Sequence, residues 1–221
     1  MGVRLERRRF VTAASALVGS LLGAGSVHAA PSWEKIDEDE GIKVYSKDIP
    51  DSSIVAFRGE ALIQQPIEKV LWVLADNEHR TEWVDRLKKS VILERKGPFD
   101  YVVYQHFSAP FPASDRDYVY RGQARRDAEG VVRISLESVE HPKAPTTVGV
   151  RGRIIKSRYL LTPKGDSTFV VVEIQMDPMG AIPTFIVNLV QKSWPMKTLK
   201  NLRTQVKKPY VGHVELPPAG G

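Results

Sequence analysis

The segment from Asp177 to Pro183 constrains the fold of this chain more than any other stretch. It joins an apolar run of period two to a long run of helical period that starts at Pro183. Gly180 can adopt the positive φ of a tight connection, and proline suits the first turn of a helix. The fold must therefore pack one long helix against the strand before it.

Period-two alternation covers most of the chain before that segment. Strands are expected at residues 41–48 and 53–63, a helix opens at Pro66, and the pattern from 90 to 176 is almost entirely strand. The spacing of charged residues changes parity at residues 154–155, which predicts a β-bulge that bends the sheet. Many strands and one long helix give an α+β architecture.

The final helix is expected from Pro183 to Lys207. Pro195 lies inside it, so a kink or loosening is expected between Gln191 and Pro195. The strands direct more apolar surface inward than this helix can cover. An internal hydrophobic cavity of roughly 300 to 1,000 Å³ is therefore expected.

Residues 1–29 are typical of an export signal, with a basic start, a mildly apolar middle and a small-x-small cleavage site. Cleavage is expected near Ala29 and Ala30, which predicts an exported, periplasmic protein. Residues 7–11, Arg-Arg-Arg-Phe-Val, resemble the twin-arginine motif, although the Sec route stays open. An uncleaved anchor is disfavoured because spanning a bilayer takes about 20 apolar residues.

The remainder reads as one domain, residues 30–211, followed by a flexible tail at 212–221 that is rich in Pro and Gly. The chain has 32 Lys and Arg against 26 Asp and Glu. Removing the four arginines and one glutamate of residues 1–29 leaves 28 and 25, a net charge of +3. This balance disfavours nucleic acid as a partner, and a monomer is expected.

No catalytic constellation is visible in the sequence. The chain has no Cys, no H-E-x-x-H helix, no G-x-S-x-G elbow and no Gly-rich phosphate loop. His79, His106, His141 and His213 form no visible pair with a nucleophile. We therefore expect no catalytic residues, no metal site, no cofactor and no enzyme activity.

Four short motifs resemble the START (StAR-related lipid-transfer) domain family, which has the helix-grip fold. They are residues 80–85 (Arg-Thr-Glu-Trp-Val-Asp), 115–119 (Asp-Arg-Asp-Tyr-Val), 150–152 (Val-Arg-Gly) and 177–183 with Val187-Asn188. The resemblance spans residues 33–206. It implies a curved antiparallel sheet wrapped around the C-terminal helix, with a lipid or another hydrophobic molecule bound inside and possible transfer between membranes. It also implies that Arg116 and Asp117 fix a strand start beside the cavity.

Alternation along the strands and the helix selects candidate ligand-binding residues. The expected cavity wall is Tyr118, Tyr120, Val172, Ile174, Met176, Phe185, Leu189 and Met196, and the expected polar or aromatic rim is Trp83, Tyr104, His106 and Arg151. Sterol-binding members of the family carry an acid and a base in the cavity. Gln105 or His106 stands where the acid would be, so the ligand is left open.

Three function classes remain on sequence grounds. The first is a carrier of a lipid or other hydrophobic molecule in the cell envelope, in transient contact with a membrane. The second is a helix-grip enzyme, similar to a cyclase, that acts on an apolar substrate through His106. The third is an envelope interaction module with a filled core.

Overall fold

The computed structural model describes residues 1–2, 32–111 and 113–220. The chain divides into two units, residues 1–30 and 31–221, and the second carries every helix and strand described below. The predicted export signal, apart from residues 1–2, and its cleavage position lie outside the described residues.

The described part of the domain contains ten strands and three helices. In chain order they are β1 (Glu34–Asp39), β2 (Ile42–Ile49), β3 (Ser52–Ile63), α1 (Ile67–Ala75), α2 (Arg80–Trp83), β4 (Leu87–Gly97), β5 (Asp100–Phe107), β6 (Arg116–Arg126), β7 (Val132–Ser138), β8 (Val150–Arg151), β9 (Arg153–Lys164), β10 (Ser167–Asp177) and α3 (Thr184–Gln205).

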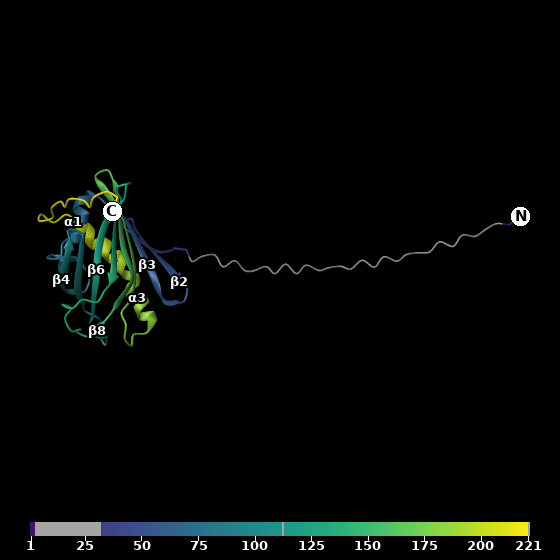
Figure 1. The fold of residues 1–221 in the computed structure, drawn as a ribbon, viewed down its shortest axis with the longest axis horizontal. Coiled ribbons are helices and arrows are strands. Elements are labelled where there is room, and N and C mark those ends of the chain that lie inside the picture. The colour runs from purple at the N-terminus through teal and green to yellow at the C-terminus, as the bar shows by residue number, and fades with distance from the viewer. Residues whose placement is uncertain (3–31, 112, 221) are drawn as a thin grey trace. The chain divides into compact units, whose positions relative to one another are not determined.

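One sheet contains all ten strands, in the order β1-β2-β3-β10-β9-β7-β6-β5-β4. Every neighbouring pair along this path is antiparallel, and the short β8 adds to β6 in parallel. The sheet curves around α3, which runs along its concave side (Figure 1). This arrangement confirms the predicted α+β, helix-grip fold.

A β-bulge lies where the change in charge spacing predicts one. In the β9–β10 ladder Gln175 pairs with Lys156 and Met176 pairs with Ile154, so Ile155 is the extra residue. A bulge adds local twist and bends its strand. Beside the bulge, the backbone of Met176 in β10 pairs with the side chain of Gln191 in α3.

The C-terminal half of α3 fills one end of the curved sheet. Leu199 and Leu202 are fully buried in the main core, together with Val172 of β10. Gly59 of β3 allows this close approach, because a Cβ there would lie 2.8 Å from both Leu199 Cδ1 and Pro195 Cβ. The helix continues through Pro195, and Pro183 precedes its first residue.

The segment after α3 packs back on the domain. Val211 is buried in the main core, and the Val214 N–H donates to the Glu68 carbonyl of α1. The Gly220 N–H donates to the carbonyl of Arg126 at the end of β6. Residues 212–220, predicted as a flexible tail, therefore make specific contacts with two elements.

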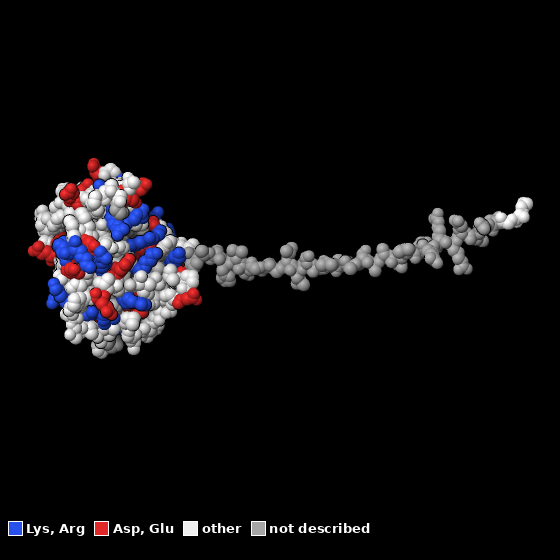
Figure 2. All heavy atoms as spheres, viewed as in Figure 1, with Lys and Arg blue, Asp and Glu red and all other residues white. Residues whose placement is uncertain are grey.

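The outer face of the sheet carries charges of both signs, as Figure 2 shows for one side. The buried Glu173 of β10 accepts from Arg58 at 2.6 Å and from Arg158 at 2.7 Å. Burial alone would raise the pKa of Glu173, but hydrogen bonds from these two arginines hold it below its usual value. Among the described helices none is long and apolar enough to cross a membrane.

Candidate functional site

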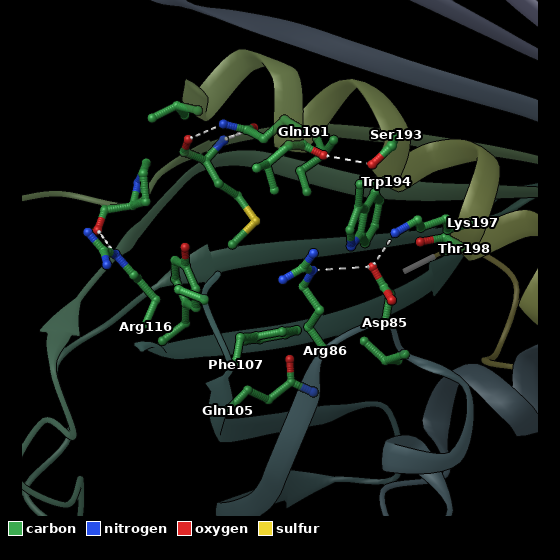
Figure 3. A pocket seen from close by; sticks show the side chains of 18 of the residues that line it. Asp85, Arg86, Gln105, Phe107, Arg116, Gln191, Ser193, Trp194, Lys197 and Thr198 are labelled. Carbon is green, nitrogen blue, oxygen red and sulfur yellow. Dashed lines mark hydrogen bonds and ion pairs between the residues drawn. The ribbon is translucent and has the colours of Figure 1, made fainter. Parts of the chain in front are cut away.

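A cavity of about 500 Å³ lies between the concave face of the sheet and the N-terminal half of α3. Figure 3 shows Gln105, Phe107 and Arg116 of the sheet on one side and Gln191 and Trp194 of α3 on the other. The cavity exists because the bent sheet and the helix diverge at this end, beyond the packed region around Leu199.

Apolar side chains form most of the cavity wall. They come from β7, β9, β10 and α3, and include Leu136, Ile154, Ile174, Met176, Val187 and Trp194. A mostly apolar wall with few polar groups is typical of small-molecule sites. The composition of the wall suits a hydrocarbon ligand.

Three tyrosines line this wall: Tyr118 and Tyr120 from β6 and Tyr159 from β9. Burial raises the pKa of Tyr118 and of Tyr120 to about 12, so both hydroxyls stay protonated at neutral pH. Gln105 of β5 lies opposite Tyr118 in the β5–β6 ladder and donates to Ser90 Oγ at 3.1 Å.

Charged residues from two parts of the chain meet in the cavity lining. Lys197 Nζ of α3 lies 2.9 Å from Asp85 Oδ2, in the loop after α2, and Arg86 Nε lies 3.8 Å from the same oxygen (Figure 3). All three side chains are at least one-third exposed. Exposed ion pairs contribute about 1 kcal/mol or less, so this contact adds little to the attachment of α3.

Two side-chain amides attach the N-terminal half of α3 to the sheet. Pairing between β3 and β10 ends at Phe57 and Ile174, although both strands continue. In the gap Asn188 accepts from the Val55 N–H at 3.1 Å, and Gln191 binds both backbone groups of Met176. Amide hydrogen bonds thus replace the strand pairing beside the cavity.

Asp115 fixes the loop between β5 and β6, part of which lines the cavity. Its carboxylate lies 2.9 Å from Lys88 Nζ and 2.7 Å from His106 Nε2, and accepts from the Ala109 N–H at 3.1 Å. These contacts, led by the one with Lys88, hold the pKa of Asp115 far below its usual value.

Arg116 connects the start of β6 to the segment before α3. Its guanidinium donates to the carbonyls of Ser114, Pro178 and Met179. Asp117, on the opposite face of β6, is fully buried and accepts from Arg151 Nε at 2.5 Å. Both residues therefore hold the frame beside the cavity, as the resemblance implies.

Six of the twelve predicted ligand-binding residues lie in the cavity wall. They are Trp83, Tyr118, Tyr120, Ile174, Met176 and Leu189. The other six lie elsewhere: Tyr104, His106, Arg151, Val172, Phe185 and Met196.

Strand alternation explains the three misplaced rim residues. Tyr104 and His106 point to the outer face of β5, where the Tyr104 hydroxyl donates to Asp117 and the His106 ring pairs with Asp115. Arg151 also binds Asp117 on that face. Gln105 and Phe107, on the inner face of the same strand, line the cavity instead.

The misplaced wall residues sit beyond the two ends of the cavity. Val172 and Met196 belong to the packed core around Leu199 and Leu202. Phe185, in the first turn of α3, is 71% exposed and faces outward. The wall also contains residues that strand alternation did not select, among them Arg80 and Tyr159, although Arg80 opens the first motif of the resemblance.

Comparisons with a family model and with individual proteins point to the same family. The START domain family matches residues 25–209. An uncharacterized protein from Pseudomonas aeruginosa is 26% identical over 199 residues, which cover 87% of this chain and 95% of that protein. Phosphatidylcholine transfer protein from Bos taurus is 29% identical and covers 77% of this chain and 82% of its own length.

A solved structure supports the same assignment. A STAR-related lipid transfer protein fragment from Xanthomonas axonopodis superimposes with a TM-score of 0.70 and 29% identity. The match covers 80% of this chain and 99% of the fragment. Similarity in sequence and similarity in structure therefore both extend over nearly the whole second unit.

Proposed function

The chain belongs to the START domain family, and from this premise we propose that it binds a lipid or another hydrophobic molecule in its cavity and transfers it between membranes. The apolar cavity of about 500 Å³ is the observation that carries the proposal. Relatives named as a phosphatidylcholine transfer protein and as a STAR-related lipid transfer protein support it.

We also propose that the protein touches membranes with the surface around the cavity mouth, here called the mouth patch. Large apolar side chains are exposed there, on the β5–β6 loop, the segment before α3 and its first turns: Phe111, Met179, Phe185, Ile186, Leu189 and Val190. The pole of the domain near β8 is mostly uncharged in Figure 2. Contiguous exposed apolar surface favours contact with a membrane or a protein.

The setting of this activity is a proposal from the sequence of residues 1–29. Their basic start, apolar middle and small-x-small site favour export to the periplasm, by the twin-arginine or the Sec route. Fractionation of cells that express the full chain tests this proposal, because the mass of the periplasmic form locates the cleavage site.

The enzyme alternative rests on His106. Its ring pairs with Asp115 on the outer face of β5, outside the cavity wall. Groups of three or more His, Cys, Asp or Glu residues that could hold a metal ion are absent among the described residues. No observation in the described structure favours an enzyme over a carrier.

Native mass spectrometry of the purified protein tests ligand binding directly. We expect an added mass that organic solvent extracts as lipid. Met176→Arg would place a cation among apolar side chains and remove the bound lipid, whereas Leu62→Arg, an exposed position on the outer face of β3, would retain it. A ligand-free parent that also takes up no lipid from vesicles would refute the function.

A further inference from the structure

Residues 80–86, here called the α2 segment, form part of the cavity wall but have little regular structure of their own. The residues of this segment that line the cavity are Arg80, Trp83, Val84, Asp85 and Arg86. The α2 helix has 4 residues, and no described side chain caps its N-terminal end. Helices this short are not stable by themselves in water. Contacts with other elements must therefore fix the position of this part of the wall.

Two residues of α3 contact the α2 segment. Lys197 Nζ lies 2.9 Å from Asp85 Oδ2 (Figure 3). One turn further along the helix, the side-chain amide of Asn201 donates to the Trp83 carbonyl at 2.7 Å. Residues four apart share one face of a helix, so α3 makes both contacts from the same side.

The third contact from that face of α3 passes through a residue that follows the helix. Gln205, one turn beyond Asn201, donates from its side-chain amide to the Tyr210 hydroxyl at 2.8 Å. The hydroxyl donates in turn to the carboxylate of Glu82, inside α2. This hydrogen bond raises the pKa of Tyr210 above its usual value, so the hydroxyl remains the donor at neutral pH.

Aromatic contacts hold the ring of Tyr210 in place. It stacks on the His79 ring with 4.2 Å between the centroids, and Trp72 of α1 lies 6.4 Å from both rings. Val211, the next residue, is buried in the main core. The START family match ends at residue 209, so membership of the family does not by itself supply the contact between Tyr210 and Glu82.

We propose that Tyr210 is a positioning residue for the cavity, which holds Glu82, and through it the wall residue Trp83, in the arrangement that binds ligand. Trp83 is 5% exposed and packs in the main core as well as lining the cavity, so a rotation of α2 would displace its indole from the ligand. Because coupling between two sites is reciprocal, a ligand in the cavity should also tighten the segment after α3. This inference rests on the proposed function and adds a residue to its site.

The affinity of isosteric variants tests the role of the hydroxyl. The probes are phosphatidylcholine and hexadecanoate, each with a fluorescent label, and the comparison uses the one that the parent binds. Tyr210→Phe keeps the ring that stacks on His79 and removes both hydrogen bonds. We expect it to bind the probe at least about fivefold more weakly. Tyr104→Phe also removes a hydrogen bond to a carboxylate, on the outer face, and should bind like the parent.

Variants of Glu82 separate positioning from a general loss of stability. Glu82→Gln keeps an acceptor for the Tyr210 hydroxyl and should bind like the parent, whereas Glu82→Leu should weaken binding as much as Tyr210→Phe. The double variant with Tyr210→Phe and Glu82→Leu should lose no more than either single one, because both changes remove the same contact. Additive losses would mean that the two residues act independently, which would overturn the proposal.

Fluorine NMR follows the cavity wall in the absence of ligand. Labelling with fluorotryptophan gives a signal for each of the 4 tryptophans, and the signal that Trp83→Phe removes belongs to Trp83. We expect Tyr210→Phe to shift the signal of Trp83 and to leave that of Trp33, which packs on Arg58 of β3, unchanged. An unchanged Trp83 signal would overturn the positioning role.

Hydrogen exchange tests the coupling in the reverse direction. The Val214 N–H donates to the Glu68 carbonyl of α1, and neither residue lines the cavity. Its exchange should slow at least about fivefold when the probe saturates the parent, but not when it saturates Tyr210→Phe. Exchange in the parent that does not respond to the probe would overturn the coupling. A parent that binds neither probe would contradict the proposed function, while the fluorine signals would still decide whether Tyr210 positions Trp83.

Discussion

The side-chain amide of Gln191 pairs with both backbone groups of Met176. Its Nε2 donates to the Met176 carbonyl at 2.7 Å, and its Oε1 accepts from the Met176 N–H at 3.0 Å. This contact joins the N-terminal half of α3 to the end of β10, where strand pairing with β3 has already stopped. The helix thus covers the cavity through a small number of hydrogen bonds that can break separately from the core.

Gln191→Met should loosen this cover. It leaves the Met176 N–H and carbonyl without their partner, which costs roughly 1 to 3 kcal/mol. We expect faster hydrogen exchange at the Met176 amide and faster lipid release to acceptor vesicles. Lys192→Met, at the next and exposed position of α3, should change neither rate. If both variants release lipid at the parent rate, α3 does not control release.

Gly59→Ala should destabilise the domain by about 1 to 3 kcal/mol, because the added methyl overlaps Leu199 and Pro195 and forces α3 away from β3. Urea denaturation followed by circular dichroism measures the change. Gly97→Ala is the matched control, since nothing lies within 4 Å of a Cβ there. An equal effect of the two substitutions would mean that α3 does not pack tightly at Gly59.

Phe111→Glu and Phe185→Glu should each weaken binding to vesicles. Burial of a phenylalanine side chain contributes about 1.5 to 3 kcal/mol, so each loss corresponds to about tenfold or more in affinity. Co-sedimentation with liposomes measures it. Leu62→Glu, which is exposed on the outer face of β3, should bind like the parent. Equal loss at all three positions would contradict the mouth patch.

Asp117→Asn should lower stability at neutral pH by about 2 kcal/mol, because Arg151 and the Tyr104 hydroxyl lose their carboxylate partner. Burial would raise the pKa of Asp117, but the hydrogen bonds and the charge of Arg151 lower it. A carboxyl group whose pKa is lower in the folded state stabilises the fold at pH values above its unfolded-state pKa of about 3.9. That contribution is lost as the pH falls through the folded-state pKa.

The difference between Asp117→Asn and the parent should therefore shrink below about pH 4. Thermal denaturation between neutral and acid pH measures it. Asp37→Asn, at an exposed strand position, is the control and should leave neutral stability unchanged. A difference between Asp117→Asn and the parent that stays constant with pH would mean that the buried carboxylate does not supply the stability.

Sequence periodicity predicted the elements well because alternation and helical spacing depend on local chain geometry. The long final helix, the strand run before it and the bulge at Ile155 are all present. The sequence pattern did not show which face of β5 points toward the cavity. Aromatic and polar residues occupy both of its faces, and only the pairing of Gln105 with Tyr118 decides the question.

Two features of the site depend on the tertiary packing of distant segments. Val172 and Met196 fit the period of an inward face, but that face runs from the cavity into the solid core around Leu199. The charge of Arg80 enters the cavity region because the C-terminal end of α1 accepts its hydrogen bonds. Neither the depth of a residue along the face nor such a cap is visible in the local pattern.

The cavity beneath α3 should also set how the protein responds to pressure. Unfolding under hydrostatic pressure is favoured in proportion to the internal void that it eliminates. A ligand that fills about 500 Å³ removes most of that void, so the loaded protein should resist compression that unfolds the empty one. The cavity that holds the ligand should thus also make the ligand-free protein sensitive to pressure.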